Sequence, residues 1–305
     1  MDIRKLEVFC KVVEYKSFTK AAQWAMISQP TVSEHIRSLE QQVDQRLIDR
    51  LGRKVEATPV GQLLYNYALK IIRLQEESMQ AIEVFSGNLI GRILIGSSTI
   101  PGTYILPHLL GRFIESHPEI KANINIDNSR TIAQKVIAGE YDLGIIGATW
   151  NERSLAWTEV FADELTVVMR PDHPLAKKEE LTIDDLLQEP FIFREHGSGT
   201  RKVIAGILEQ QGYRENSLQE VAVIGTTAAV KQAIKAGIGI SILSLRAILE
   251  DIRHNSLVGR PLKGMQMQRP FYLIQRRNRE LSPVAAVFVE YILQQADDRT
   301  DFHRE

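Results

Sequence analysis

The sequence has one cysteine in 305 residues, which excludes an internal disulfide framework and a cysteine-based zinc site. That residue, Cys10, falls on the apolar face of an expected first helix and reads as a core residue. No apolar run approaches the ~18–20 residues that span a bilayer. The opening residues MDIRKLEVF lack the apolar core of a secretory signal. These absences predict a cytoplasmic protein.

Motifs of common catalytic sites are also missing. The segment HGSGT at 196–200 lacks the spacing of a G-x-S-x-G elbow, and no P-loop or G-x-G-x-x-G opens a helix after the first strand of the second half. The 7 histidines form no H-x₃₋₅-H metal pair. We therefore predict no catalytic residue, no metal ligand and no cofactor, which leaves an α/β enzyme as a remote alternative.

Charge of one sign is not in excess either. The net charge is −1, with 44% hydrophobic and 25% charged residues, as in ordinary water-soluble globular proteins. Residues 1–58 hold 10 basic and 8 acidic residues, so a basic partner surface is only weakly indicated. The overall charge therefore indicates no partner, and only local sequence motifs can indicate one.

Two short helical patterns separated by a tight turn lie between residues 17 and 43. Ser17 can cap the first, and small residues allow another helix to cross it closely: Ala21, Ala22 and Ala25. Ser28 can cap the second, and Pro30 falls in its first turn, where a missing N–H group costs little. The second helix then packs through one face: Val32, Ile36 and Leu39. This pattern predicts a helix-turn-helix.

The other face of the second helix is polar at its leading end. Such groups can hydrogen-bond base edges and phosphates, although a solvated face of a small helical bundle would look the same. The following segment favours DNA, because a turn between two short extended stretches at 46–61 carries a basic cluster, as a wing does. The expected DNA-binding residues are Ser28, Gln29, Pro30, Thr31, Ser33, Arg37, Arg50, Arg53 and Lys54.

A long helix is expected from Pro59 to Ser86, about 42 Å at ~1.5 Å per residue. Apolar and small residues recur along it at alternating steps of four and three, at Val60, Leu64, Tyr67, Ile71, Leu74, Ser78, Ala81 and Phe85. That heptad pattern favours a partner helix, while burial in its own domain is the alternative. We expect Val60, Leu64, Tyr67, Ile71 and Leu74 to form a dimerisation surface.

From Gly91 onward, short apolar strands alternate with helices in two rounds. Alternation of this kind predicts parallel sheets covered by helices, arranged here as two lobes. A late strand, RPFYLIQR at 269–276, and a helix around 283–295 complete the pattern.

Over essentially its full length the sequence resembles the LysR-type transcriptional regulators. The resemblance is carried by Phe9 and Val13, by SFTKAA at 17–22, by ISQPTVSEHIRSLE at 27–40 and by RLIDRLGRKVEATPVG at 46–61. Three residues depart from the family pattern: Glu34, Ile48 and Ala57. The last two are packing exchanges, whereas Glu34 places an acidic group where DNA is expected.

The resemblance implies an N-terminal, mainly helical winged helix-turn-helix (1–58), a linker and dimerisation helix (59–87) and an α/β effector domain (91–305) like type 2 periplasmic binding proteins. Lobe I would comprise 91–163 and 268–305, and lobe II 164–267, with chain crossings near 162–164 and 265–269. It also implies a homotetramer on promoter DNA, with RNA polymerase as a candidate partner. A secreted solute-binding protein fits the second half alone and is a remote alternative.

Four loops rich in hydroxyl groups follow strands, where open α/β sheets bind ligands. Three lead into helices, whose N-terminal N–H groups favour anions, although any one Ser or Thr could merely cap its helix. Arg201 would add a charge at the rim or lie on the surface of its helix. The expected ligand-binding residues are Ser98, Thr99, Thr149, Ser198, Gly199, Thr200, Thr226 and Thr227.

These loops suit a small anion with several acceptor oxygens better than an aromatic compound. Because the sequence is similar to regulators of sulfur assimilation, sulfite, sulfate or a related oxyanion is the expected effector. A small carboxylate is the second expectation.

Overall fold

The computed structural model describes residues 1–51, 54–85, 89–265 and 267–297. The chain divides into two compact units, one of residues 1–88 with 138–140 and one of the rest. Within the described ranges, no helix is both long and apolar enough to cross a bilayer.

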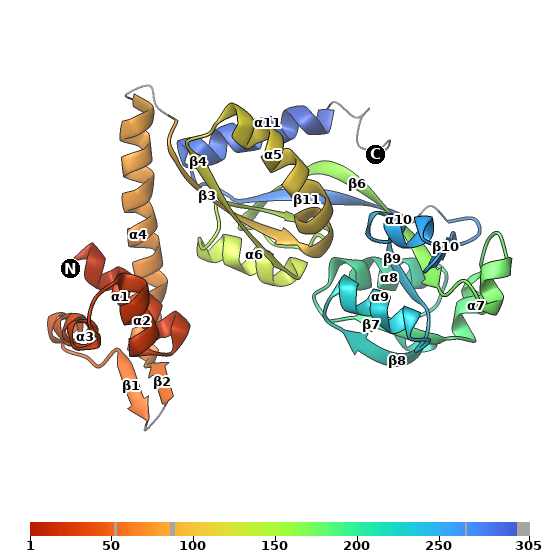
Figure 1. Ribbon diagram of the computed structural model, residues 1–305, viewed down its shortest axis with the longest axis horizontal. Helices are drawn as coiled ribbons and strands as arrows, with labels where there is room; N and C mark the ends of the chain where they lie inside the picture. Colours follow the sequence, from red (N-terminus) through yellow and green to blue (C-terminus); the bar gives the residue numbers. More distant parts are fainter. Residues whose placement is uncertain (52–53, 86–88, 266, 298–305) are drawn as a thin grey trace. The chain divides into compact units, whose positions relative to one another are not determined.

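The first unit holds three short helices, a β-hairpin and a long helix (Figure 1). Side chains of Asp2, Ser17 and Ser28 cap the three short helices at their N-termini, which confirms the two caps expected from the sequence. Met26, between the second and third helices, is left-handed at φ 54°, so the chain reverses within a few residues. The elements are α1 (Ile3–Tyr15), α2 (Phe18–Ala25), α3 (Gln29–Val43), β1 (Ile48–Leu51), β2 (Lys54–Ala57) and α4 (Pro59–Phe85).

The core of this unit is built from the apolar faces of its helices. Ala21, Val32 and Leu39 are fully buried, so α3 packs on α2 through one face, as predicted. Cys10 lies in the same core at 2% exposure. Burial there raises the pKa of its thiol to about 12, which agrees with its expected role as a core residue.

Helix α4 has two distinct faces. One face, including Leu64 and the fully buried Ala68, packs on the core of the first unit. Another face presents a row of large apolar side chains, which we call the apolar stripe of α4: Val60, Leu63, Tyr67, Ile71 and Leu74, all 38–66% exposed. Of the expected dimerisation residues, Leu64 therefore contacts its own domain, while the other four belong to the stripe.

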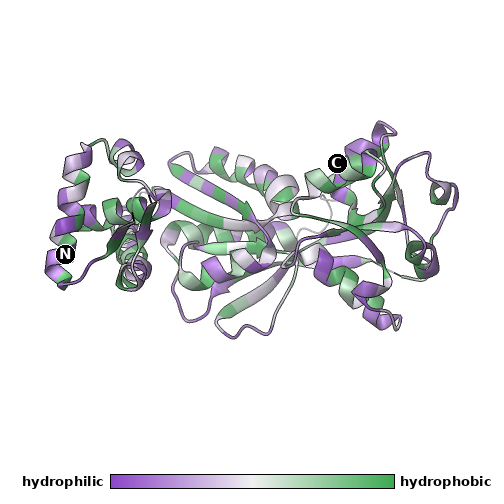
Figure 2. Ribbon diagram, turned by 90° about the horizontal axis from the view of Figure 1, so that it is seen from below, coloured by the Kyte–Doolittle hydropathy of each residue, from purple (hydrophilic) through white to green (hydrophobic). Residues whose placement is uncertain are grey.

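The second unit is organised around a mixed sheet. Strands β3 (Gly91–Ser98), β4 (Ile120–Asp127) and β5 (Leu143–Ile146) are parallel. Helices α5 (Leu106–Ser116) and α11 (Pro283–Asp297) cover one face, and α6 (Ser129–Ala138) covers the other (Figure 1). A π-helical turn, Pro101–Ile105, leads into α5. Figure 2 shows hydrophobic residues in the interior strands and helices mixed with polar ones, and mainly polar residues on the outer turns.

Two antiparallel strands, β6 (Leu155–Met169) and β11 (Gln268–Arg276), connect this sheet to a second core. The C-terminal end of β6 pairs there with β9 (Ser241–Ser244) and β10 (Val258–Arg260). Around them lie the parallel pair β7 (Pro190–Arg194) and β8 (Gln219–Ile224), helices α7 (Ile183–Leu187), α8 (Gly199–Gln210), α9 (Thr227–Lys235) and α10 (Leu245–Arg253), and 3₁₀ turns Pro174–Lys177 and Glu215–Ser217.

Strands β6 and β11 (Gln268–Arg276) lie side by side, from Gln268 opposite Glu164 to Arg276 opposite Leu155. The expected parallel strands are present in β3, β4 and β5 and in the pair β7 and β8, but β6 and β11 pair antiparallel with each other and β11 pairs antiparallel with β5. We use lobe I for the sheet of β3, β4 and β5 with its helices, and lobe II for the core around β7 and β9.

Candidate functional site

The leading end of α3 is polar and open to solvent. Gln29, Pro30 and Thr31 are exposed, Ser33 is half-buried, and the Gln29 Nε2 amide donates to Ser33 Oγ at 3.0 Å. Ser28 is exposed but its hydroxyl accepts from the Thr31 backbone N–H at 3.2 Å, so it is committed to the cap. The exposed Gln29 amide uses one N–H on Ser33, and its oxygen and second N–H remain for other partners.

A hollow of about 620 Å³ lies between α3 and the start of the hairpin. The exposed Arg37 lines it, together with Glu34, which places an acidic group on the same surface. Glu40 Oε1 accepts from the backbone N–H groups of Leu47 and Ile48 at 2.9 and 3.4 Å, so the hairpin is bonded to the helix beside it.

The expected basic wing falls at the hairpin. Arg50 lies in β1 and Lys54 in β2, opposite Val55 and Leu51 respectively, but the positions of both side chains lie outside what the structure describes. Arg53 lies outside the described residues altogether.

A second polar hollow lies between lobe I and lobe II, and we call it the cleft hollow; the room in it for a water-sized probe is only about 20 Å³. This volume is far below the roughly 300–1,000 Å³ usual for drug-sized ligands. Lobe I contributes the ends of β3 and the start of α6, while lobe II contributes the start of α8. The lining residues are Ser98, Thr99, Ile100, Asn128, Ser129, Arg194, Ser198, Gly199, Thr200 and Arg269.

Five expected ligand-binding residues line the cleft hollow: Ser98, Thr99, Ser198, Gly199 and Thr200. Ser198 stands at the N-cap of α8 but makes no capping bond with its side chain, so its buried hydroxyl is available to a ligand. This observation counts against the alternative that it merely caps its helix.

The other three expected ligand-binding residues are not among those lining it. Thr226 is exposed and caps α9, accepting from the Ala229 backbone N–H at 3.2 Å. Thr227 accepts from Arg194 Nη1 at 2.7 Å. The carbonyl of the half-buried Thr149 accepts from Lys202. For Thr226 the capping interpretation therefore describes the structure.

Ser129 is a polar residue of the cleft hollow that sequence reasoning missed. It is 1% exposed, and its Oγ has no hydrogen-bond partner among the described residues. The neighbouring Asn128 caps α6 by accepting from the Thr131 N–H at 2.9 Å. A buried hydroxyl without a partner costs free energy unless something binds it, so this atom points to a ligand.

Three buried arginines lie in or near the cleft hollow. Arg194 lines it and donates to Glu195, Thr227 and the Gly225 carbonyl. Arg269 also lines it. Arg201 was expected either to add a charge at the rim of the cleft or to lie on the surface of its helix. It is instead buried, at 7% exposure, where it bonds Glu215 and its guanidinium carbon lies 4.7 Å from the centre of the Phe193 ring.

The two lobes touch directly beside the cleft hollow. A Cβ placed on Gly199 would lie 2.8 Å from the carbonyl oxygen of Gly147 and 3.1 Å from Ser129 Oγ. The Arg130 N–H donates to the Gly197 carbonyl at 3.4 Å. The lobes are therefore closed on one another at this place, and only a residue without a side chain fits at position 199.

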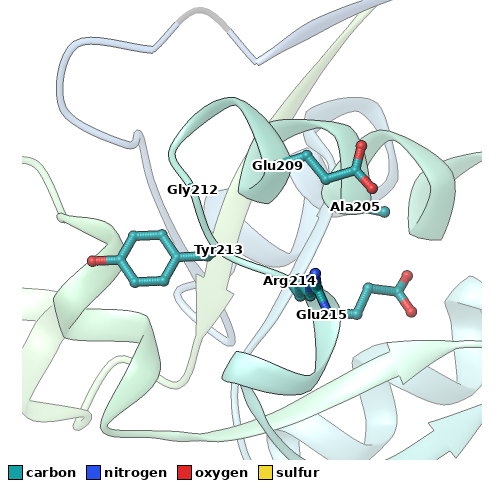
Figure 3. A pocket seen from close by; sticks show the side chains of 6 residues that line it. All are labelled: Ala205, Glu209, Gly212, Tyr213, Arg214 and Glu215. Carbon is teal, nitrogen blue, oxygen red and sulfur yellow. The ribbon is translucent and has the colours of Figure 1, made fainter.

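A larger hollow, of about 460 Å³, lies on lobe II at the end of α8. In Figure 3 its side chains diverge: Tyr213 points one way while Glu209 and Glu215 point another. Tyr213 donates to Asp184 at 3.0 Å. Without convergent polar groups this hollow offers a ligand no defined site.

Comparison with known proteins agrees with both halves of this structure. Residues 3–62 match the model of a bacterial regulatory helix-turn-helix protein of the lysR family, and residues 86–297 match the LysR substrate binding domain.

Two curated relatives and one solved structure illustrate the likeness. A "Probable RuBisCO transcriptional regulator" of Cyanidioschyzon merolae is 34% identical over 95% of this chain and 96% of its own. The "HTH-type transcriptional regulator CysL" of Bacillus subtilis is 32% identical over 93% and 94%. The CcmR regulatory domain of Synechocystis PCC6803 "in complex with 2-PG" is 29% identical, covers 68% of this chain and 98% of its own, and superposes with a TM-score of 0.61.

A polar recognition helix, a small polar cleft between two lobes and matches that together span almost the whole chain lead to one conclusion: the protein belongs to the LysR family and is a transcriptional regulator with a ligand-binding domain, not an enzyme.

Proposed function

We propose that this regulator is switched by a small oxyanion that binds in the cleft hollow. The observation that carries the proposal is the unpaired hydroxyl of Ser129, at 1% exposure, beside the uncommitted hydroxyl of Ser198. The starts of α6 and α8 meet at the same hollow, and N–H groups of helix N-termini favour negative charge. Sulfate and sulfite are compact and carry several acceptor oxygens, which suits the donors of the hollow.

A phosphorylated carboxylate is the second candidate. The Synechocystis regulatory domain in complex with 2-PG, 2-phosphoglycolate, is 29% identical to this chain. That ligand also presents oxyanion groups, so the hydroxyl and helix-terminal donors named above suit it as well. Its greater length requires more room than sulfate does, in a hollow that offers a water-sized probe only about 20 Å³.

Thermal unfolding of the full chain tests the ligand. We expect sulfate, sulfite or 2-phosphoglycolate to raise the Tm, since a ligand at a hundredfold excess over its Kd stabilises by about 2.7 kcal/mol. Ser129→Ala should reduce the shift, because a hydrogen bond to a charged group contributes roughly 1.5–3 kcal/mol. The exposed Ser116, at the end of α5, supplies the control Ser116→Ala. An uncharged apolar compound such as toluene raising the Tm while no anion does so would rule out the oxyanion.

Gln29 is the residue through which we propose that α3 distinguishes bases. A glutamine amide can bond adenine in a bidentate way, so Gln29→Ala should cost roughly 1–3 kcal/mol of discrimination at one base position. Gel shifts on an operator selected from random DNA by the wild-type protein, and on its single-base variants, would measure this. Gln42→Ala, an exposed glutamine near the end of the same helix, should change nothing. Unaltered base preference in Gln29→Ala would mean that another face of α3 meets DNA.

A further inference from the structure

A buried carboxylate–guanidinium pair lies where the two long strands run from lobe I to lobe II. Asp163 of β6 and Arg269 of β11 stand opposite each other in register. Arg269 Nε and Nη2 both reach Asp163 Oδ2, at 2.9 and 2.8 Å. Neither side chain is more than 4% exposed, so the pair is held away from water and its geometry is tightly constrained.

The remaining nitrogen of Arg269, Nη1, is bonded to a residue that lines the cleft hollow. Nη1 donates to Thr200 Oγ1 in the first turn of α8, at 3.0 Å. It also lies 3.4 Å from where a Cβ of Gly147 would be. A guanidinium carries five N–H donors, and the bonds described for Arg269 use three of them. Two nitrogens of this group therefore hold Asp163, while the third bonds Thr200, a residue that lines the cleft hollow as Arg269 itself does.

Asp163 is bound from a second direction as well. Its Oδ1 accepts from Ser244 Oγ at 2.7 Å. Ser244 stands at the N-cap of α10 without a side-chain capping bond, because its hydroxyl is used on Asp163. Both carboxylate oxygens are thus engaged, which fixes the direction in which Arg269 points.

The other arginines near the cleft differ from Arg269 in what they bond. The guanidinium of Arg194 is paired with the Glu195 carboxylate through Nε and Nη2, and its Nη1 bonds Thr227. Arg201 is paired with Glu215 and does not line the hollow. Arg269 lines the hollow, and its Nη1 is bonded to the neutral hydroxyl of Thr200 in the first turn of α8 rather than to a carboxylate.

We propose that Arg269 is the residue that receives the effector's oxyanion, through Nη1, and that Asp163 is its counter-charge. This assignment rests on the proposed function, namely that an anion occupies the cleft hollow. Because Asp163 cancels the charge of Arg269, the anion meets a neutral pair and is held by directed hydrogen bonds. Compact oxyanions with several acceptors are then preferred over anions in general, and the pair sets the specificity of the site.

Opposite changes at the two residues distinguish this role from a purely structural one. Arg269→Gln should lower the affinity for sulfate at least about tenfold, because it removes a charged donor. Asp163→Asn is isosteric and keeps an acceptor for Arg269, yet it removes a negative charge. It should therefore raise the affinity for sulfate several-fold, and raise it less for singly charged nitrate. A pair that served only packing would lose affinity in both variants.

Isothermal titration of the full chain with sulfate and with nitrate would measure these affinities. Arg112→Gln removes an equal charge from an exposed position on α5 and should leave both affinities unchanged. If either single variant fails to fold, the double variant Asp163→Asn/Arg269→Gln replaces the ion pair by two amides, an exchange that buried pairs often tolerate. It should bind sulfate at least about tenfold more weakly than the wild-type protein.

The outcomes separate the two proposals. A wild-type protein that binds neither sulfate, sulfite nor 2-phosphoglycolate overturns the proposed function, and this assignment with it. A wild-type protein that binds, with Arg269→Gln or the double variant binding equally well, overturns the assignment of Arg269 alone. A loss of affinity in Asp163→Asn as large as that in Arg269→Gln would also overturn it, since the carboxylate would then be supporting the fold of the site.

Discussion

Leu74→Asp is expected to turn a dimer of this protein into monomers. Leu74 is 66% exposed in the apolar stripe of α4, so the substitution leaves the fold of the single chain intact. Against a second copy of the stripe, however, the aspartate would be buried without a partner, which costs several kcal/mol. A loss of about 4 kcal/mol raises the dissociation constant roughly a thousandfold. Sedimentation velocity over a range of concentrations would measure it.

A matched control is available on the same helix. Asn66 is exposed, polar and outside the stripe, so Asn66→Asp adds the same charge and should leave the assembly unchanged. Operator binding should weaken with the dimer, because two linked helix-turn-helix units read two half-sites together. If Leu74→Asp and Ile71→Asp both sedimented like the wild-type protein, the apolar stripe would not be the contact between copies.

Gly199→Ala is expected to abolish the response to the effector without harming the fold. The new Cβ would lie 2.8 Å from the Gly147 carbonyl oxygen and 3.0 Å from its carbon, which real Cβ atoms do not tolerate. Backbone on both sides cannot yield like a flexible side chain, so lobe II must move away from lobe I. If the closed arrangement becomes a hundredfold rarer, the apparent Kd of the effector rises by about the same factor.

Alanine is otherwise favourable at this position, which makes the variant informative. Gly199 begins α8, and alanine is a better helix former than glycine, so the Tm without ligand should hold or rise. Gly206→Ala, on the same helix with nothing within 4 Å of the new Cβ, should leave ligand affinity intact. Titration with sulfate measures both affinities. If Gly199→Ala and Gly206→Ala bound sulfate equally well, ligand binding would not require the close contact between Gly199 of lobe II and Gly147 of lobe I.

Local patterns in the sequence predicted most of the first unit. The caps at Ser17 and Ser28 and the buried face of α3 depend on residues three or four positions apart, and such spacings are visible in a sequence. The two faces of α4 were harder to separate, because Leu64 fits a heptad equally well whether it packs on its own domain or on a partner.

The cleft was predictable only in part, because its residues come together from distant segments. Arg269 bonds Thr200 and Asp163, which are 69 and 106 positions away, and no local spacing reports such pairs. A signal was nevertheless present, since residues of opposite charge, Asp163 and Arg269, occupy the two expected crossings between lobes. The sequence could not tell which Ser and Thr residues before helices cap the helix and which line the cleft hollow. Ser198 and Thr226 look alike in sequence, yet only Thr226 bonds its own helix.

The buried thiol of Cys10 makes this protein convenient for site-specific labelling. Desolvation holds its pKa near 12, and maleimide reagents react with the thiolate, so Cys10 stays inert at neutral pH. Cysteines introduced at the exposed Lys121 of β4 and Glu250 of α10 would therefore take up a donor and an acceptor dye without prior removal of the native cysteine. Energy transfer between them would follow the separation of the lobes in single molecules as effector is added.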